Sequence, residues 1–184
     1  MDFLEIMKSR RSCRAYQGGK TIPREDLLKI IEAGRLTPSG CNAQPWKFIV
    51  VDSPEAKSKL CDAIVVNGGV TGAPWRENVS AFIILVEQKA DVKPMVLDYY
   101  HDSQRFAQGD IGAACMNMCI EAHCLGIANC IIGMNDQEKM EQYFGIPSGS
   151  AVRMVLALGY AVNDHAPAKI RKELDEVCSF NYWK

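Results

Sequence analysis

Pro38-Ser39-Gly40-Cys41-Asn42-Ala43-Gln44-Pro45-Trp46 is the stretch that says most about the fold and function of this chain. It follows a helical pattern and leads into the apolar run Phe48-Ile49-Val50-Val51. Small residues and prolines gain little from core packing, but they hold hydrogen-bonding groups on a stiff backbone. Asn42 and Gln44 each offer an amide donor and a carbonyl acceptor, as recognition of a flat heterocycle requires. The pattern predicts a binding loop, although a proline-rich connection with solvated amides has the same composition.

Length and charge limit the kind of protein that this chain can be. Its 184 residues fit a single domain, residues 1–184, that buries about 70% of the unfolded surface. Lys and Arg number 21 against 22 Asp and Glu, which gives no electrostatic case for nucleic acid. The N-terminus lacks a signal-peptide pattern, and no apolar run reaches the ~18 residues of a membrane span. We therefore expect a cytoplasmic protein that binds neither nucleic acid nor membrane.

The cysteines suggest either thiols or a metal site. Because the chain is long and shows no secretion signal, we expect reduced thiols rather than disulfides. The cluster from Cys115 to Cys130 lacks the C-x2-C spacing of zinc ribbons and bacterial ferredoxins, so we expect no metal. Cys115 and Cys119, four residues apart on one helix face, are then small buried hydrophobes.

Apolar periodicity predicts alternating helices and strands around the loop. Helices are expected over residues 2–9, 23–37, 53–61, 103–125 and 136–143, and strands over residues 46–51, 81–86, 128–132 and 151–160. The helix over 103–125 is apolar nearly all round, ends at Gly126, and should be buried against a sheet or a second subunit, with His123 as a hydrogen-bonded core residue. Residues 67–75 are rich in glycine and are expected to form a rim over a site, and a polar C-terminal arm is expected after the last strand. The sum is an α/β or α+β layered fold with helices packed on a mixed sheet.

Two groups of cationic residues lie at opposite ends of the chain. Arg10-Arg11-Ser12-Cys13-Arg14 places three guanidinium groups and a hydroxyl within five residues, and Lys169-Ile170-Arg171 adds two alternating cations. One guanidinium group can bind two phosphate oxygens at once, so the two cationic segments together could hold a phosphomonoester. Each group alone is equally compatible with a solvated basic patch.

Four motifs in this order resemble the FMN-dependent nitroreductase family. They are the Arg10-to-Arg14 segment, the loop from Pro38 to Trp46, the Gly126-to-Gly133 segment, and the strand end Leu158-Gly159-Tyr160. The resemblance spans nearly the whole chain. It implies an α+β, three-layer fold, with a mixed but mainly antiparallel sheet flanked by helices. It also implies a homodimer of the domain-swapped type, with FMN bound between the two subunits.

Positions matching the family's cofactor site are implied by the same resemblance. The ribityl-phosphate clamp would consist of Arg10, Ser12, Arg14, Lys169 and Arg171, with Arg11 near the pyrimidine and ribityl end. The loop that supports the flavin, from the other subunit, would consist of Pro38, Ser39, Gly40, Asn42 and Gln44. Asn67 would reach the pyrimidine edge, and the backbone of Ile132 and Gly133 would face flavin N5 and O4. Cys41 stands where many relatives carry Ser or Thr, and Ile132 stands where some larger relatives carry an acidic residue.

The activity implied is NAD(P)H oxidation with reduction of a nitroaromatic, quinone or similar electron-poor acceptor. Hydride would pass in a ping-pong cycle through flavin N5, so no side chain is expected to act as a catalytic acid or base. NADH and NADPH are equally open as donors. Two alternatives remain, a non-catalytic FMN-binding or storage protein and a flavoenzyme of the same fold with other chemistry, such as reductive dehalogenation or flavin fragmentation.

Overall fold

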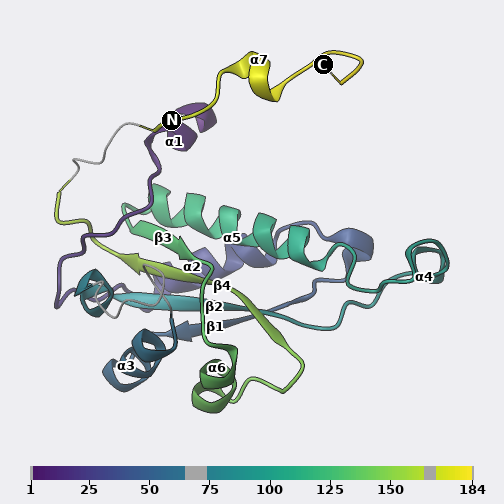
Figure 1. The fold of residues 1–184 in the computed structure, drawn as a ribbon. Helices are drawn as coiled ribbons and strands as arrows, with labels where there is room; N and C mark the ends of the chain where they lie inside the picture. The colour runs from purple at the N-terminus through teal and green to yellow at the C-terminus, as the bar shows by residue number, and fades with distance from the viewer. Residues whose placement is uncertain (1, 65–73, 164–168, 184) are drawn as a thin grey trace.

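The computed structural model describes residues 2–64, 74–163 and 169–183 and is built around one four-stranded sheet (Figure 1). The strands, in spatial order, are β1 (Trp46–Val51), β2 (Ala81–Glu87), β4 (Ala151–Gly159) and β3 (Ala128–Ile132). All three pairings between them are antiparallel. The parallel contact that the structure shows is an isolated bridge between Ser12 and Asn129, so the sheet is less mixed than the sequence predicted.

Helices cover both faces of this sheet (Figure 1). The helices are α1 (Phe3–Ser9), α2 (Arg24–Arg35), α3 (Pro54–Ala63), α4 (Pro94–Tyr100), α5 (Ala107–Cys124), α6 (Gln137–Phe144) and α7 (Leu174–Val177), with the 3₁₀ turns η1 (Gly40–Asn42) and η3 (Pro74–Asn78). One core cluster joins the sheet to α2 and α5, and a second joins it to α3 and α6. The result is the predicted three-layer α+β arrangement.

Strand β2 shows why the sheet needs helices on both sides. All seven of its side chains are buried, as expected for a continuous apolar run. Phe82 and Ile84 pack into the cluster with α3 and α6, whereas Ile83 and Leu85 pack into the cluster with α2 and α5. Because side chains alternate along a strand, neither face can be left to water.

Helix α5 lies on the α2 side of the sheet and supplies more buried side chains to that core than any other described element. Seven of its 18 residues are buried, among them Cys115 and Cys119, so the prediction that these cysteines are small core residues is confirmed. The helix starts four residues later than predicted, because Asp102 accepts a hydrogen bond from the Gln104 N–H and forms a turn there. Gly126 follows the helix at φ 74°, a left-handed conformation that glycine adopts without steric cost. Long as α5 is, none of the helices in the described ranges has the length and apolarity that a membrane crossing needs.

The N-terminal segment after α1 lies across the ends of two strands. Cys13 donates its N–H to the Asn129 carbonyl of β3 at 2.8 Å, and Gln17 donates to the Tyr160 carbonyl at 2.8 Å. Tyr16 forms an antiparallel bridge with Ala161, just after β4. These contacts place the first cationic segment beside the start of β3.

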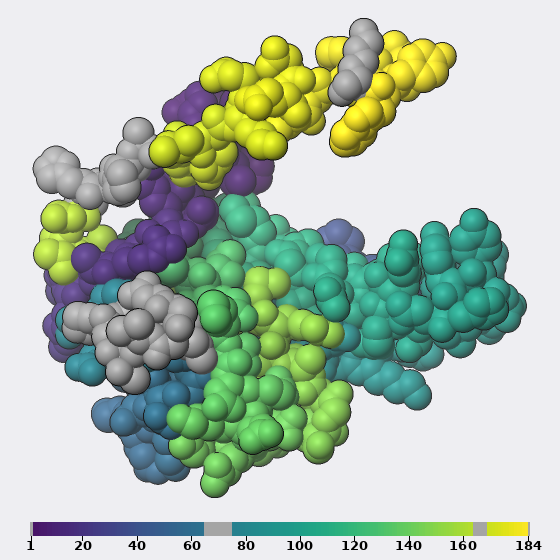
Figure 2. Space-filling view, viewed as in Figure 1, coloured from purple at the N-terminus to yellow at the C-terminus, as the bar shows by residue number. Residues whose placement is uncertain are grey.

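Two elements were not predicted from the sequence. Helix α4 has no buried residue and projects away from the body with the loops that flank it (Figures 1 and 2). Helix α7 lies in the C-terminal arm and is also without a buried residue. The arm was expected to be polar, which is wrong, because it exposes large apolar side chains at Ile170, Leu174, Val177, Phe180, Tyr182 and Trp183.

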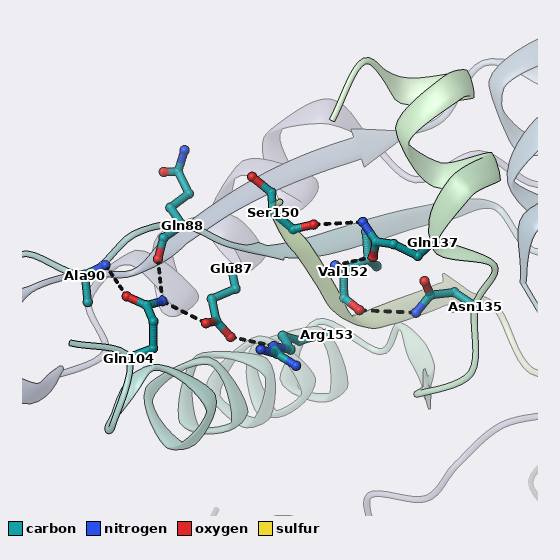
Figure 3. A network of polar contacts seen from close by, with 9 residues as sticks. All are labelled: Glu87, Gln88, Ala90, Gln104, Asn135, Gln137, Ser150, Val152 and Arg153. Atoms are coloured by element: carbon teal, nitrogen blue, oxygen red, sulfur yellow. Dashed lines mark hydrogen bonds and ion pairs between the residues drawn. The ribbon is translucent and has the colours of Figure 1, made fainter. Parts of the chain in front are cut away.

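A polar network ties the segment between β2 and α5 to the sheet (Figure 3). The buried Glu87 carboxylate accepts from Arg153 Nε at 2.5 Å and from Gln104 Nε2 at 2.7 Å. Gln104 Oε1 in turn accepts the Ala90 N–H at 2.6 Å. A buried carboxylate is tolerable only when its oxygens are satisfied in this way. The network fixes where α5 begins relative to the sheet.

The α2–α5 contact gives a test of packing. In a Gly34→Ala variant the new Cβ would overlap Met118 Cε and come within 3.0 Å of Met118 Cγ, a fully buried side chain. We expect the free energy of unfolding to fall by about 1–3 kcal/mol, measured by urea denaturation. The control is Gly109→Ala in α5, where the Cβ meets open space and should raise stability by about 0.5–1 kcal/mol. Equal stability of Gly34→Ala and wild type would contradict this account of the packing.

Candidate functional site

The loop from Pro38 to Trp46 has a strained backbone with hydrogen bonds inside the loop. Cys41, Asn42 and Gln44 have φ values of 56°, 56° and 47°, in the left-handed region that residues with a Cβ rarely adopt. Ser39 Oγ accepts the Gln44 N–H at 2.9 Å, and the Ser39 carbonyl accepts the Asn42 N–H at 2.9 Å. Asn42 and Gln44 are both exposed, so their amides remain available to a ligand.

Two residues at the start of α5, the N-cap Phe106 and Asp110 in the first turn, hold this loop, and sequence reasoning missed the role of both. Asp110 Oδ2 accepts the Gly40 N–H at 3.1 Å. The Phe106 ring packs on Gly40 so closely that a Cβ there would lie 2.7 Å from a ring carbon. Only glycine fits at position 40. The signal in the sequence was a single acidic residue in the first turn of an otherwise apolar helix.

The first cationic segment is held at the opposite end of α5. Arg10 NH1 lies 3.4 Å from Asn129 Oδ1, and Asn129 is buried and donates to the Cys119 carbonyl at 3.0 Å. Ser9 Oγ and His123 Nε2 form a hydrogen bond of 2.7 Å. His123 is hydrogen-bonded as predicted but half-exposed, because it lies near the end of α5 and not in the core.

The second cationic segment meets the first, although more than 150 residues separate them in the sequence. Lys169 Nζ donates to the Met7 carbonyl in α1, which brings the base of the C-terminal arm beside Arg10. Partial burial, followed by the Arg10, Arg171 and Arg11 guanidinium groups, lowers the pKa of Lys169. Burial, Arg10 and Lys169 likewise lower the pKa of His123. The two segments therefore form one region of repelling positive charges, as predicted.

No acidic side chain in the described part of the chain forms an ion pair with Arg10, Arg14, Lys169 or Arg171. The positive charge of this region therefore favours an anionic ligand, since an anion would relieve the repulsion. Beside it lies a cavity of about 670 Å³. Its walls include Ser9, Arg11, Ser12, Cys13, Lys20 and His123.

The remaining predicted positions lie along or beyond the edge of the sheet. The Ile132 side chain is buried in the cluster with α3 and α6, and Gly133 is exposed just after β3. Since β3 is an edge strand, its outer backbone groups are not used by a neighbouring named strand. Having Ile at position 132, where some larger relatives carry an acidic residue, thus affects the side chain in the core. The outer backbone groups of β3 stay in place. Asn67 lies outside the described residues.

Sites at the two ends of α5 are too far apart to meet within one chain. Gly40 contacts Asp110, and Ser9 contacts His123, thirteen residues further along the helix. At 1.5 Å of rise per residue, the two contacts are about 20 Å apart. The structure therefore brings the cationic residues together but keeps the loop from Pro38 to Gln44 away from them.

A model of the nitroreductase family matches residues 7–160. The chain belongs to the nitroreductase family. This confirms the resemblance seen in the four sequence motifs and makes the chain a member of a family of oxidoreductase enzymes.

Relatives of this nitroreductase-family chain match it over nearly full length. A Bacillus subtilis protein named "Putative NAD(P)H nitroreductase YdgI" is 29% identical over 208 residues, covering 100% of this chain and 98% of that protein. An Archaeoglobus fulgidus protein named "Putative NADH dehydrogenase/NAD(P)H nitroreductase" is 35% identical over 161 residues, covering 85% of this chain and 84% of its own.

Solved structures have the same fold. A nitroreductase family protein of Clostridium difficile superposes with a TM-score of 0.83 at 24% identity, covering 100% of both chains. A nitroreductase-type structure from Exiguobacterium sibiricum, solved in complex with FMN, has a TM-score of 0.81 at 25% identity and covers 100% of this chain and 98% of its own. The three-layer arrangement of this nitroreductase-family protein is therefore shared by proteins of its family.

The hydrogen bond between Asp110 and Gly40 leads to a testable prediction about the loop from Pro38 to Gln44. In an Asp110→Ala variant the Gly40 N–H loses its carboxylate acceptor, a charge-assisted bond worth about 1.5–3 kcal/mol. We expect hydrogen exchange of the Gly40 amide to accelerate by about tenfold or more, measured by NMR. Asp110→Asn keeps an acceptor oxygen and should show a smaller change. Identical exchange in all three proteins would show that Phe106 packing alone holds the loop.

Proposed function

We propose that this chain is an FMN-dependent NAD(P)H oxidoreductase that reduces nitroaromatic, quinone or similar electron-poor acceptors. The observation that carries the proposal is the convergence of Arg10, Arg171 and Lys169 from opposite ends of the chain. Membership of the family supports it, as does a neighbour of the same fold that was solved with FMN. The acceptor class is inferred from the family alone.

The cationic residues fit a phosphomonoester. Arg10 is fixed by Asn129, and Lys169 is fixed by the Met7 carbonyl, so neither side chain needs to be ordered when an anion binds. The pKa of Lys169 is lowered by partial burial and then by repulsion from Arg10, Arg171 and Arg11, and a bound dianion would offset that repulsion. Ser12 and Arg14, both exposed on the adjoining segment, would add a hydroxyl and a further guanidinium group.

The outer edge of β3 would then receive the flavin ring. Backbone N–H groups at Ile132 and Gly133 are proposed to face N5 and O4, where a donor stabilises negative charge on the reduced ring. The bound FMN would supply the hydride chemistry, and the protein would supply binding and orientation. No described side chain needs to act as an acid or base.

We further propose that the site is completed by a second copy of the chain. The loop from Pro38 to Gln44 is about 20 Å from the cationic residues along α5, too far to contact the same ring from within one chain. The arm from 169 to 183 exposes six large apolar side chains, more than an isolated chain leaves in water without a partner. A homodimer would cover the arm and bring the partner's loop to the flavin.

The test of the function is an anaerobic absorbance spectrum of the FMN-loaded protein. We expect the flavin band to bleach on addition of NADH or NADPH and to return on addition of a nitroaromatic compound or a quinone. A bound flavin that neither donor bleaches would favour the storage alternative. Bleaching without recovery by either acceptor would point to other chemistry on the same fold.

The phosphate clamp has a separate test in the variants Arg14→Ala and Arg171→Ala. Each removes a charge-assisted contact worth about 1.5–3 kcal/mol, so the Kd for FMN should rise about 10- to 100-fold. Far-UV circular dichroism should stay unchanged, since both residues are exposed. The control is Lys59→Ala on α3, where an exposed lysine pairs with Glu55 and should leave the Kd unchanged. Wild-type affinity in both arginine variants would exclude the clamp.

A further inference from the structure

Cys13 and Cys130 each follow one residue of a backbone bridge. The isolated bridge between Ser12 and Asn129 is parallel, and the Cys13 N–H donates to the Asn129 carbonyl at 2.8 Å. Because both chains run in the same direction at this bridge, Cys13 and Cys130 follow it side by side on adjacent segments. Neighbouring strands lie about 4.7–4.9 Å apart, which is within the roughly 4.4–6.8 Å Cα separation of disulfides.

Both side chains also point to the same side of the sheet. Cys130 is a buried member of the core cluster with α3 and α6, and Cys13 packs against that cluster. Each thiol bonds to a nearby backbone carbonyl in the structure, Cys13 Sγ to Ala15 at 3.3 Å and Cys130 Sγ to Ile131 at 3.7 Å. Both cysteines are free, and both side chains contact the same core cluster.

Tyr16 brings a third polar group to the pair. Its ring is 2% exposed, and its hydroxyl has no hydrogen-bond partner among the described residues. Tyr16 belongs to the same core cluster as Cys130, and Cys13 packs against that cluster. Burial, and then the Cys13 and Cys130 thiols, raise the pKa of Tyr16. A buried hydroxyl without an acceptor is costly, and a thiolate or an oxidised sulfur would satisfy it.

We propose that Cys13 and Cys130 form a redox-active dithiol that small-molecule disulfides oxidise to an internal disulfide. The Cys13 thiolate attacks one sulfur of the reagent RS–SR, forming Cys13–S–SR and releasing RS⁻. The Cys130 thiolate then attacks the Cys13 sulfur and releases the second RS⁻. The protein loses two electrons and two protons, and the reagent is reduced to two RSH.

The exposure of the two thiols decides which one reacts first with the external disulfide. Cys13 is half-buried and lines the cavity of about 670 Å³, whereas Cys130 is 2% exposed. Burial raises the pKa of Cys130, and the Arg14 guanidinium opposes that rise. Cys13 is thus the thiol that an external reagent reaches, and Cys130 is placed to resolve the mixed disulfide.

A second cysteine pair provides the comparison. Cys115 and Cys119 are four residues apart on α5 and hydrogen-bonded to each other, but both are fully buried. No reagent reaches them from the cavity, because neither lines it. They should stay reduced under conditions that oxidise Cys13 and Cys130.

The test uses the full-length protein without added FMN, so that the cavity lined by Cys13 stays open to the reagent. The protein is reduced and then treated with 2-hydroxyethyl disulfide. Remaining thiols are blocked with N-ethylmaleimide, and a non-reducing tryptic digest is analysed by mass spectrometry. We expect the peptide 12–14, which carries Cys13, joined to the peptide 106–139, which carries Cys130. Because 106–139 also contains Cys115, Cys119 and Cys124, variants decide the partner.

The cross-linked species should disappear in Cys13→Ser and in Cys130→Ala and persist in Cys119→Ala and Cys124→Ser. Tyr16→Phe keeps the ring and should slow closure several-fold, because the thiolate loses its donor. Circular dichroism checks that each variant is folded. Persistence of the cross-link in Cys130→Ala, or recovery of the 12–14 peptide only as a mixed disulfide or maleimide adduct in wild type, would overturn the proposal.

Discussion

The packing of α5 against the sheet and α2 is the constraint on which the rest of the structure depends. Six buried side chains of α5 form one core cluster with residues of α2, β1, β2 and β4. Ile111 and Met118 are the largest of the six, and burial of a side chain of that size contributes about 1.5–3 kcal/mol. The polar contacts that place the candidate site are individually weaker, at about 0.5–1.5 kcal/mol for neutral hydrogen bonds. These polar contacts can nonetheless be specific, because the helix to which they are made is buried.

Each part of the candidate site is attached to a different level of this helix. Phe106 and Asp110 hold the strained loop at one end, the Cys119 carbonyl holds Asn129 in the middle, and His123 holds Ser9 at the other end. The rise of the helix thus sets the spacing between the segments that carry the proposed binding residues. This is also why one chain cannot assemble both halves around one ligand.

Much of this arrangement could be predicted because it is encoded by burial. The apolar run of β2 and the nearly all-round apolar α5 must both be buried inside the fold. The bounds of both were predicted to within a few residues. Helix α4 could not be predicted because it buries nothing and so has no periodic signal. The meeting of Lys169 with Arg10 could be suggested from the two cationic groups and from the family resemblance, but composition alone does not show which distant segments come together. Asp110 was missed because its role depends on a single backbone N–H seventy residues away.

The C-terminal arm has a consequence for the life of the chain in a cell. Its aromatic and aliphatic side chains, from Ile170 to Trp183, stand in water in the isolated chain, on a segment tied to the body through the Lys169 contact with α1. Exposed apolar segments of this kind are what chaperones and proteases bind when they sort folded from unassembled proteins. In the homodimer proposed above, a second copy of the chain would cover this segment and so remove that signal.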